Sequence, residues 1–351
     1  MDDVQKPFVS IVVPCFNEEA ILQSNANRII EFLESKNYKY LWELVLVNDG
    51  SKDNTGKIAD DLARHRTDVR VIHHPINLNL GLALQTGFRN AKGDIIVVLD
   101  VDLSYSVESV EQLVDKLIET SADIVLASPY MKGGKVTGVP FSRRIMSKWV
   151  NGMMRMAAQD KYHTYTAMVR AYRTSFIRSL NLKTRDYEVS PEIMYKAMIL
   201  RARIVEIPAH LDWTEQNKFK GKRTSSIRIL RGLFSGIMSA FIFRPYIFFL
   251  GIGAVLMVLS LYELIWLLSD TLSDMKLASL QNPPVKDAFS FSLLLQFRKN
   301  PQSFIVGGIT FIAAVQFLSL GFLSLQNKRY FEELFHLGTA LKKESDKQTI
   351  S

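Results

Sequence analysis

Two long apolar stretches in the C-terminal third constrain this chain more than any other feature. The first, Pro245 to Ser269, carries one charge, Glu263, and the second, Ser303 to Leu325, carries none. About 20 helical residues cross the roughly 30 Å hydrocarbon core of a bilayer, and buried core helices are usually shorter and amphipathic. We therefore predict two transmembrane helices. Glu263 lies beside Tyr262 and Trp266 near the end of its stretch, so we expect its carboxylate to reach the interface.

The distribution of basic residues predicts the orientation of these helices. Seven Lys and Arg residues precede the first stretch, with Glu215 as the one acid among them: Lys218, Lys220, Lys222, Arg223, Arg228, Arg231 and Arg244. This side should be cytoplasmic, the loop 270–302 extracytoplasmic, and the tail 326–351 cytoplasmic again. The net charge of +8 then favours anionic lipid over nucleic acid as the partner of the basic residues.

The N-terminus and the cysteine content agree with a cytoplasmic domain. MDDVQKP is acidic and leads directly into a predicted strand, so we expect no signal peptide. The single cysteine, Cys15, forms no internal disulfide, which suits a reducing compartment. We predict an integral protein of the cytoplasmic (plasma) membrane whose N-terminal domain faces the cytoplasm.

In residues 1–225, short apolar runs typical of strands alternate with segments whose apolar residues recur at helical spacing. Strands are predicted at 9–13, 44–47, 69–73, 95–99, 123–127 and 203–207, and helices at 21–33, 53–66, 107–119 and 189–201. This alternation is typical of an α/β fold with a doubly wound, mostly parallel sheet. Residues 128–180 show no clear pattern. The segment 226–244 suggests an interfacial amphipathic helix, with a simple extension of the first span as the alternative.

Acidic residues follow three of the predicted strands. Asp100 and Asp102 close the run DIIVVLD, and two carboxylates in that spacing suit a hard divalent cation shared with substrate phosphates. A solvated turn is the alternative for such a pair alone. Glu18 and Asp49 follow the first and second strands, and ligands of doubly wound sheets bind at the carboxyl ends of strands. We therefore predict one crevice with a Mg²⁺ or Mn²⁺ site. His73-His74 has no second cluster at ligand spacing, so we interpret it as an ordinary strand-end pair.

Basic residues gather between 132 and 148: Lys132, Lys135, Arg143, Arg144 and Lys148. Arg143 and Ser147 lie four residues apart, so they share one face of a helix and together suit a phosphate. A solvated charged face is the alternative.

These segments together resemble the family 2 inverting glycosyltransferases of GT-A (Rossmann-like) fold, and within them the dolichol-phosphate mannose synthases and related polyprenyl-phosphate glycosyltransferases. The resemblance covers nearly the whole chain. It is carried by SIVVPCFNEEA (10–20), VNDGSKDNT (47–55), NLNLGLALQTGF (77–88), GDIIVVLDVDLSYS (93–106), PYMKGGKVTGVPFSRRIMS (129–147), VRAYR (169–173) and YEVSPEIMYKA (187–197).

The resemblance implies a role for each candidate site residue. The nucleotide sugar would be bound by Pro14, Phe16, Glu18, Asp49, Gln85, Asp100 and Arg223. The metal would be held by Asp102, Asp100 and Ser104, and the acceptor phosphate by Arg143, Ser147 and Lys132, with Asp100, Asp102, Arg143 and Ser147 as the catalytic set. Arg170 matches the arginine of the FRAYR block in these synthases.

Three departures from the synthases are visible. Ser104 stands where they often have a glutamine ligand, Pro129 where they usually have an arginine, and Thr166-Ala167-Met168 where they usually have Thr-Ser-Gly.

The function implied is inverting transfer of one sugar from a GDP- or UDP-linked donor to a dolichyl or undecaprenyl phosphate. The lipid phosphate is already anionic, so the site needs positioning and charge stabilisation rather than a base. One alternative is a processive polysaccharide synthase, although the chain has no QxxRW block. Another is a non-catalytic membrane scaffold that keeps the fold. The sequence is compatible with more than one sugar, nucleotide base and lipid, and with a homo-oligomer.

Overall fold

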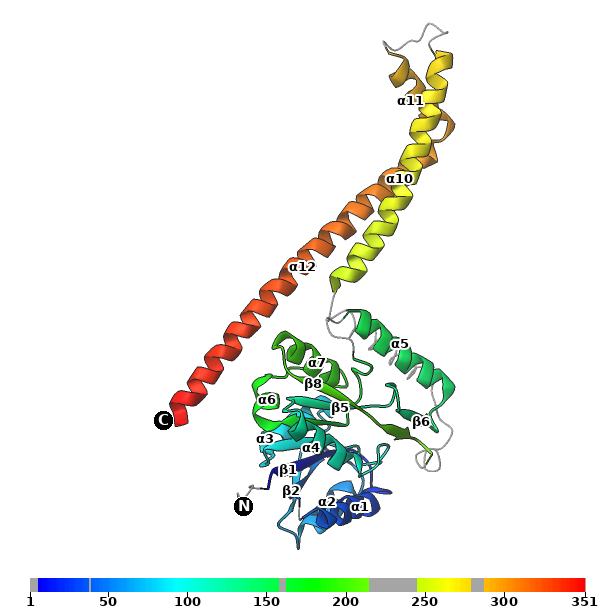
Figure 1. Ribbon diagram of the computed structural model, residues 1–351. Helices are drawn as coiled ribbons and strands as arrows, with labels where there is room; N and C mark the ends of the chain where they lie inside the picture. Colours follow the sequence, from blue (N-terminus) through cyan, green and yellow to red (C-terminus); the bar gives the residue numbers. More distant parts are fainter. Residues whose placement is uncertain (1–5, 38, 158–161, 215–244, 279–286, 351) are drawn as a thin grey trace. The chain divides into compact units, whose positions relative to one another are not determined.

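The computed structural model describes residues 6–37, 39–157, 162–214, 245–278 and 287–350. The chain forms two compact units, the first built mainly from residues 1–243 and the second from Arg244–Leu334 (Figure 1). The predicted interfacial helix at 226–244 lies outside the described residues.

Strands and helices alternate along the first unit. In chain order they are β1 (Phe8–Cys15), α1 (Leu22–Ser35), β2 (Leu41–Asn48), α2 (Thr55–Ala63), β3 (Val69–His73), α3 (Leu80–Asn90), β4 (Ile95–Val98), α4 (Ser109–Glu119), β5 (Ile124–Ser128), β6 (Lys135–Thr137), α5 (Phe141–Ala157), β7 (Arg170–Arg173), α6 (Thr174–Ser179), α7 (Val189–Ile199), β8 (Ile204–Pro208) and β9 (His210–Asp212).

A seven-stranded sheet in the order β3-β2-β1-β4-β7-β5-β8 forms the centre of this unit (Figure 1). All of its strand pairs are parallel except the two that involve β7. The mostly parallel α/β sheet predicted from the sequence is therefore confirmed. Its central strands are buried on both faces, which explains why they read as continuous apolar runs.

The sequence did not predict β7, which lies antiparallel between β4 and β5. The reason is Arg170, the first residue of the strand, which is fully buried. Its guanidinium donates to the carbonyl oxygens of Tyr165 at 2.7 Å and Ser190 at 3.2 Å. A short strand that begins with a charged residue lacks the apolar run by which buried strands are recognised.

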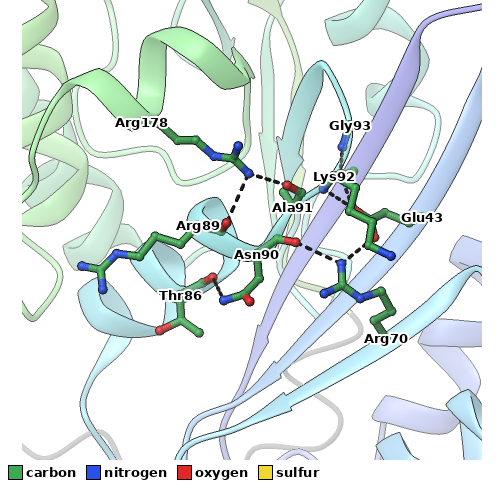
Figure 2. Close-up of polar contacts among 10 residues, drawn as sticks. Glu43, Arg70, Thr86, Arg89, Asn90, Ala91, Lys92, Gly93 and Arg178 are labelled. Carbon is green, nitrogen blue, oxygen red and sulfur yellow. Dashed lines mark hydrogen bonds and ion pairs between the residues drawn. The ribbon is translucent and has the colours of Figure 1, made fainter. Parts of the chain in front are cut away.

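A network at the amino-terminal edge of the sheet closes the turn from α3 into β4 (Figure 2). Buried Glu43 accepts hydrogen bonds from the Ser10 hydroxyl at 2.6 Å, from the Lys92 amide, and from Arg70 at 2.9 Å. Arg178 donates to three carbonyl oxygens at the end of α3, those of Phe88, Arg89 and Ala91. These contacts hold β1, β2 and β4 in register at the edge opposite the polar loops.

The second unit contains two long apolar helices, α10 (Pro245–Ala278) and α12 (Pro301–Ile350), with α11 (Ala288–Lys299) between them. Segments Pro245–Met275 and Pro301–Leu341 are long and apolar enough to cross a membrane, and only 11% of the most apolar window of each is buried. Their side chains thus face outward, which suits lipid surroundings. The predicted loop 270–302 is largely helical: α10 continues to Ala278, and FSFSLLLQF lies in α11.

Close packing joins α10 to α12. A Cβ added at Gly253 would lie 2.9 Å from Leu318, and one at Gly321 would lie 2.6 Å from Leu250. Small residues let transmembrane helices approach closely in this way. Glu263 does not reach outward as expected. One of its carboxylate oxygens is buried near Gly307 and has no hydrogen-bond partner among the described residues.

Candidate active site

The loops after β1 and β2 form one continuous rim at the carboxyl edge of the sheet. The Asn17 amide donates to the Ser51 hydroxyl at 3.0 Å, and the Lys52 amide donates back to Asn17 Oδ1 at 2.9 Å. The Glu18 amide donates to Thr55 Oγ1 at 2.7 Å. Asn17 has a positive φ of 55°, a conformation that asparagine tolerates better than most residues. Glu18 is therefore held half-buried on a cross-braced rim.

Asp49 is the first residue of the loop after β2 and is buried. Its Oδ1 lies 2.7 Å from His74 Nδ1 and accepts the Leu78 amide at 2.9 Å, while His74 Nε2 lies 2.9 Å from the Thr86 hydroxyl. His73 contacts Asn48 and Asp60 through its two ring nitrogens. Both histidines thus engage protein groups of the surrounding strands and helices.

Asp100 and Asp102 occupy a tight turn that follows β4, the neighbour of β1. Leu103 has a positive φ of 49°, which reverses the chain between the second carboxylate and Ser104. Ser104 is buried and contacts both carboxylates: its amide donates to Asp102 Oδ1 at 3.1 Å and its hydroxyl to Asp100 Oδ2 at 3.3 Å. Ser104 therefore fixes the orientation of the acidic pair.

The donor set at this turn suits a cation shared with a substrate. Two carboxylates two residues apart are hard oxygen ligands, and Mg²⁺ is usually bound by one or two carboxylates together with substrate phosphates. Within the described ranges, no three His, Cys, Asp or Glu side chains gather as a metal cluster. The two carboxylates fit a divalent ion that is shared with a substrate phosphate.

The strand β9 connects the acidic turn to helix α5. The Asp212 amide donates to the Ser104 carbonyl at 2.8 Å, and the next residue, Trp213, lies under the Arg143 guanidinium, 5.0 Å from ring centroid to Arg143 Cζ. A cation over an indole face is held by the ring quadrupole. Ser147 lies one turn further along α5. The predicted phosphate-binding pair is thus tethered to the predicted metal turn.

Tyr187, the first residue of the YEVSPEIMYKA segment, joins this group, although the sequence alone assigned it no role. Partial desolvation, followed by the carboxylates of Asp186 and Asp100, raises the pKa of Tyr187, and Arg143 opposes the shift. The phenol lies within electrostatic reach of both halves of the site.

The remaining candidates lie at different places. Gln85 is buried on α3 and donates to the Thr184 carbonyl at 2.8 Å, which anchors the loop that carries Tyr187. Pro14 is half-buried near the end of β1, Phe16 is 42% exposed just beyond it, and Lys132 is exposed in the turn before β6. Arg223 lies outside the described residues.

Residues 10–181 match the profile of Glycosyl transferase family 2. The chain belongs to glycosyltransferase family 2. Its sheet and the two apolar C-terminal helices give a GT-A-like domain followed by candidate membrane spans.

Several curated proteins are similar to this chain. The dolichol-phosphate mannosyltransferase of Pyrococcus furiosus is 29% identical over 232 residues, which cover 64% of this chain and 62% of that protein. The undecaprenyl-phosphate 4-deoxy-4-formamido-L-arabinose transferase of Edwardsiella ictaluri is 32% identical, covering 57% and 59%. The polyprenol monophosphomannose synthase of Mycolicibacterium smegmatis is 28% identical, covering 62% and 81%. The match thus spans less than two thirds of the first two relatives.

Among solved structures, the mannosyltransferase of Pyrobaculum calidifontis in complex with GDP-Man and Mn²⁺ is 13% identical, with a TM-score of 0.41, and covers 98% of this chain and 89% of its own.

Proposed function

We propose that this chain transfers a single sugar, with inversion, from a nucleotide sugar to a polyprenyl phosphate at the cytoplasmic face of a membrane. The observation that carries the proposal is the tether between the two halves of the site. Ser104 donates to both Asp100 and Asp102. Its carbonyl oxygen also accepts the Asp212 amide, and the next residue, Trp213, packs against Arg143. One compact group thus offers carboxylates for a metal-bound diphosphate and a cation for a second phosphate.

The relatives support this pairing of substrates. Each of the three is named for joining a sugar to dolichol, undecaprenyl or polyprenol phosphate. We infer that the same acceptor class binds here, with the nucleotide part of the donor on the rim that carries Glu18, Asp49 and Phe16.

The reaction requires the chain to position two anionic partners. A phosphate oxygen of the acceptor attacks the anomeric carbon, and the bond from that carbon to the nucleoside diphosphate breaks with its electron pair on the leaving oxygen. A divalent ion, when bound, neutralises charge on the departing diphosphate. Arg143 and Ser147 hold the acceptor phosphate in line with the donor. No proton has to be removed, because a phosphate monoester is already ionised at neutral pH.

Helix α5 supports placement of the acceptor site at a bilayer. Its outer face exposes Phe141, Ile145 and Trp149, four residues apart, with exposed fractions of 78%, 51% and 49%. Arg144 and Lys148 are exposed beside this apolar stripe. An apolar face bordered by cations is typical of helices that lie in the membrane interface, and Trp is enriched there.

Transfer to a lipid phosphate tests the proposal directly. Full-length protein in detergent is first screened with GDP- and UDP-sugars for thermal stabilisation in Mn²⁺, because a ligand that binds the native state raises its melting temperature. The stabilising donors are then incubated with farnesyl phosphate, and the glycolipid product is measured. We expect Asp102→Asn to lower the transfer rate by about a hundredfold or more, as loss of a main electrostatic contact does.

Asp61→Asn is the matched control, because Asp61 is an exposed carboxylate on α2 that pairs with Arg64. It should leave the rate unchanged. A folded wild type that binds no nucleotide sugar, or that binds one and transfers nothing to farnesyl phosphate, would contradict the proposed activity and favour a scaffold.

A further inference from the structure

Asn151 is a buried amide, 3% exposed, that lies one turn after Ser147 on α5. Its Oδ1 accepts the backbone amide of Tyr165 at 2.7 Å. A backbone N–H can only donate, so this contact determines which end of the amide carries the oxygen. The Nδ2 group of Asn151 must then face the other way, toward Ser147 and Thr166.

The Nδ2 group contacts oxygens of both residues. It donates to the Ser147 carbonyl at 2.9 Å and to the Thr166 hydroxyl at 3.2 Å, and it has a longer contact of 3.5 Å with the Ser147 hydroxyl. A hydroxyl that accepts a hydrogen bond still has its own hydrogen to donate elsewhere. Thr166 is exposed, so its hydrogen can point to a ligand on the outer side.

Two charged side chains, Glu206 and Arg170, fix the segment that leads into Thr166. The carboxylate of Glu206 accepts the amides of His163 at 2.9 Å and Thr164 at 3.1 Å. The fully buried Arg170 donates to the Tyr165 carbonyl at 2.7 Å. The three residues directly before Thr166 are therefore held in place before any ligand arrives. A binding group that is to act without reorganisation needs such support.

We propose that Thr166 is a second hydroxyl donor to the phosphate of the acceptor lipid, and that Asn151 is the positioning residue that orients it beside Ser147. This rests on the proposed placement of the acceptor phosphate at Arg143 and Ser147. Arg143 supplies the positive charge, and the two hydroxyls supply directed hydrogen bonds to phosphate oxygens, which are strong because the acceptor is ionised.

The affinity of the full-length chain for farnesyl phosphate tests this assignment. Thr166→Val keeps the shape of the side chain and removes the hydroxyl, so we expect the Kd to rise about tenfold, as for one lost hydrogen bond to a charged group. Thr166→Ser should restore binding. Thr164→Val is the matched control, because Thr164 is 1% exposed in the same segment and cannot reach a ligand.

Asn151→Ala separates positioning from simple stability. It should weaken farnesyl phosphate binding and leave the affinity for the nucleotide sugar unchanged. Combined with Thr166→Val it should weaken binding by less than the product of the two single effects, because one residue acts through the other. If Asn151→Ala weakened the binding of both ligands equally, Asn151 would have a structural role only, and the proposal that it positions Thr166 would be overturned.

Three outcomes distinguish this inference from the proposed function. If Arg143→Ala and Ser147→Ala weaken binding while Thr166→Val matches wild type, the inference fails and the proposed function stands. If wild type binds farnesol as well as farnesyl phosphate, no phosphate site exists and both fail. If inorganic phosphate at equal concentration stabilises the protein as much as farnesyl phosphate does, the site takes free anions and the inference is overturned.

Discussion

Ser104 shows how a departure at one position is accommodated. The related synthases often have a longer, metal-binding side chain there, whereas this serine is buried and contacts both carboxylates of the acidic turn. Its amide also closes the turn that Leu103 makes possible with a positive φ of 49°. We infer that Ser104 contributes mainly by holding in place Asp100 and Asp102, the two carboxylates that would hold a divalent ion.

Glu43 carries the pH dependence that this structure predicts for stability. Burial alone would raise the pKa of the Glu43 carboxyl, but hydrogen bonds from Ser10, Lys92 and Arg70 outweigh it and lower the pKa below its ordinary value of 4.5. The folded state therefore holds the proton less tightly than the unfolded state does. The stabilisation is present above pH 4.5 and is lost as the pH falls toward the lowered pKa.

We expect Glu43→Gln to lower the free energy of unfolding at pH 7 by about 3 kcal/mol, since it breaks a buried ion pair. The difference from wild type should shrink as the pH falls below 4.5. Thermal unfolding at pH 7, 5 and 4 measures both effects. Glu119→Gln is the control, because that side chain is 68% exposed and its pair with Lys116 should contribute little. A difference that is constant across this range would contradict the assignment.

Some residues of the site could be predicted from local sequence patterns, and others depend on contacts between segments far apart in the chain. Asp100 and Asp102 could be predicted because the motif is local and ends an apolar run. Arg143 and Ser147 could be placed on one helical face by their spacing. The contacts of Trp213 with Arg143 and of Asn151 with Thr166 could not, because they join segments whose proximity only the fold determines.

At the scale of elements, the parallel strands were predictable and β7 was not. Strands such as β1 and β2 are buried on both faces and contain almost only apolar residues. The antiparallel β7 is four residues long and places Arg170 beside Val98 and Leu126. The Arg170 guanidinium donates to the carbonyl oxygens of Tyr165 and Ser190, which lie outside its own strand, and no local pattern reveals such contacts.

Two helix glycines should respond to the same substitution with opposite signs. A Cβ at Gly87 on α3 would lie 2.3 Å from Val12 of β1, whereas a Cβ at Gly152 on α5 would meet nothing within 4 Å. We expect Gly87→Ala to destabilise by about 1–3 kcal/mol through overpacking. Gly152→Ala should stabilise by about 0.5–1 kcal/mol through helix propensity. Melting temperatures of the two variants and of the wild type measure both effects. A lower melting temperature for Gly152→Ala would contradict the open space beside Gly152.

The apolar stripe of α5 should enter the lipid interface. Cys15 is buried and burial raises the pKa of its thiol, so an added surface cysteine can be labelled selectively. An environment-sensitive dye attached at Phe141→Cys should emit at shorter wavelength when the protein is in anionic lipid nanodiscs than when it is held in amphipol without lipid. Ile118→Cys is the control, since Ile118 is 46% exposed on α4. Equal spectra at both positions would exclude docking through this face.

For the whole molecule, composition alone predicted the division into an N-terminal domain and a C-terminal helical unit. Charge is mixed with short apolar runs in the N-terminal part and nearly absent from the two stretches in the C-terminal part. The sequence missed how far the helices extend: α10 continues to Ala278 and α12 to Ile350. Lys299 at the end of α11 pairs with Asp274 of α10 at 2.8 Å. Charged residues beyond an apolar span can remain helical when they pair with one another, which hydropathy does not register.

The orientation of the membrane helices gives the last prediction. From the basic residues before α10 and at Lys328 and Arg329 we expect both ends of the helical pair in the cytoplasm, and the α11 segment outside. A cysteine at Gln302, which is exposed at the start of α12, should therefore react with a membrane-impermeant maleimide in intact cells. A cysteine at Glu333, also exposed, should react only after the membrane is permeabilised. The reverse labelling would place the acidic turn on the far side from cytoplasmic nucleotide sugars, and the proposed reaction could not take place there.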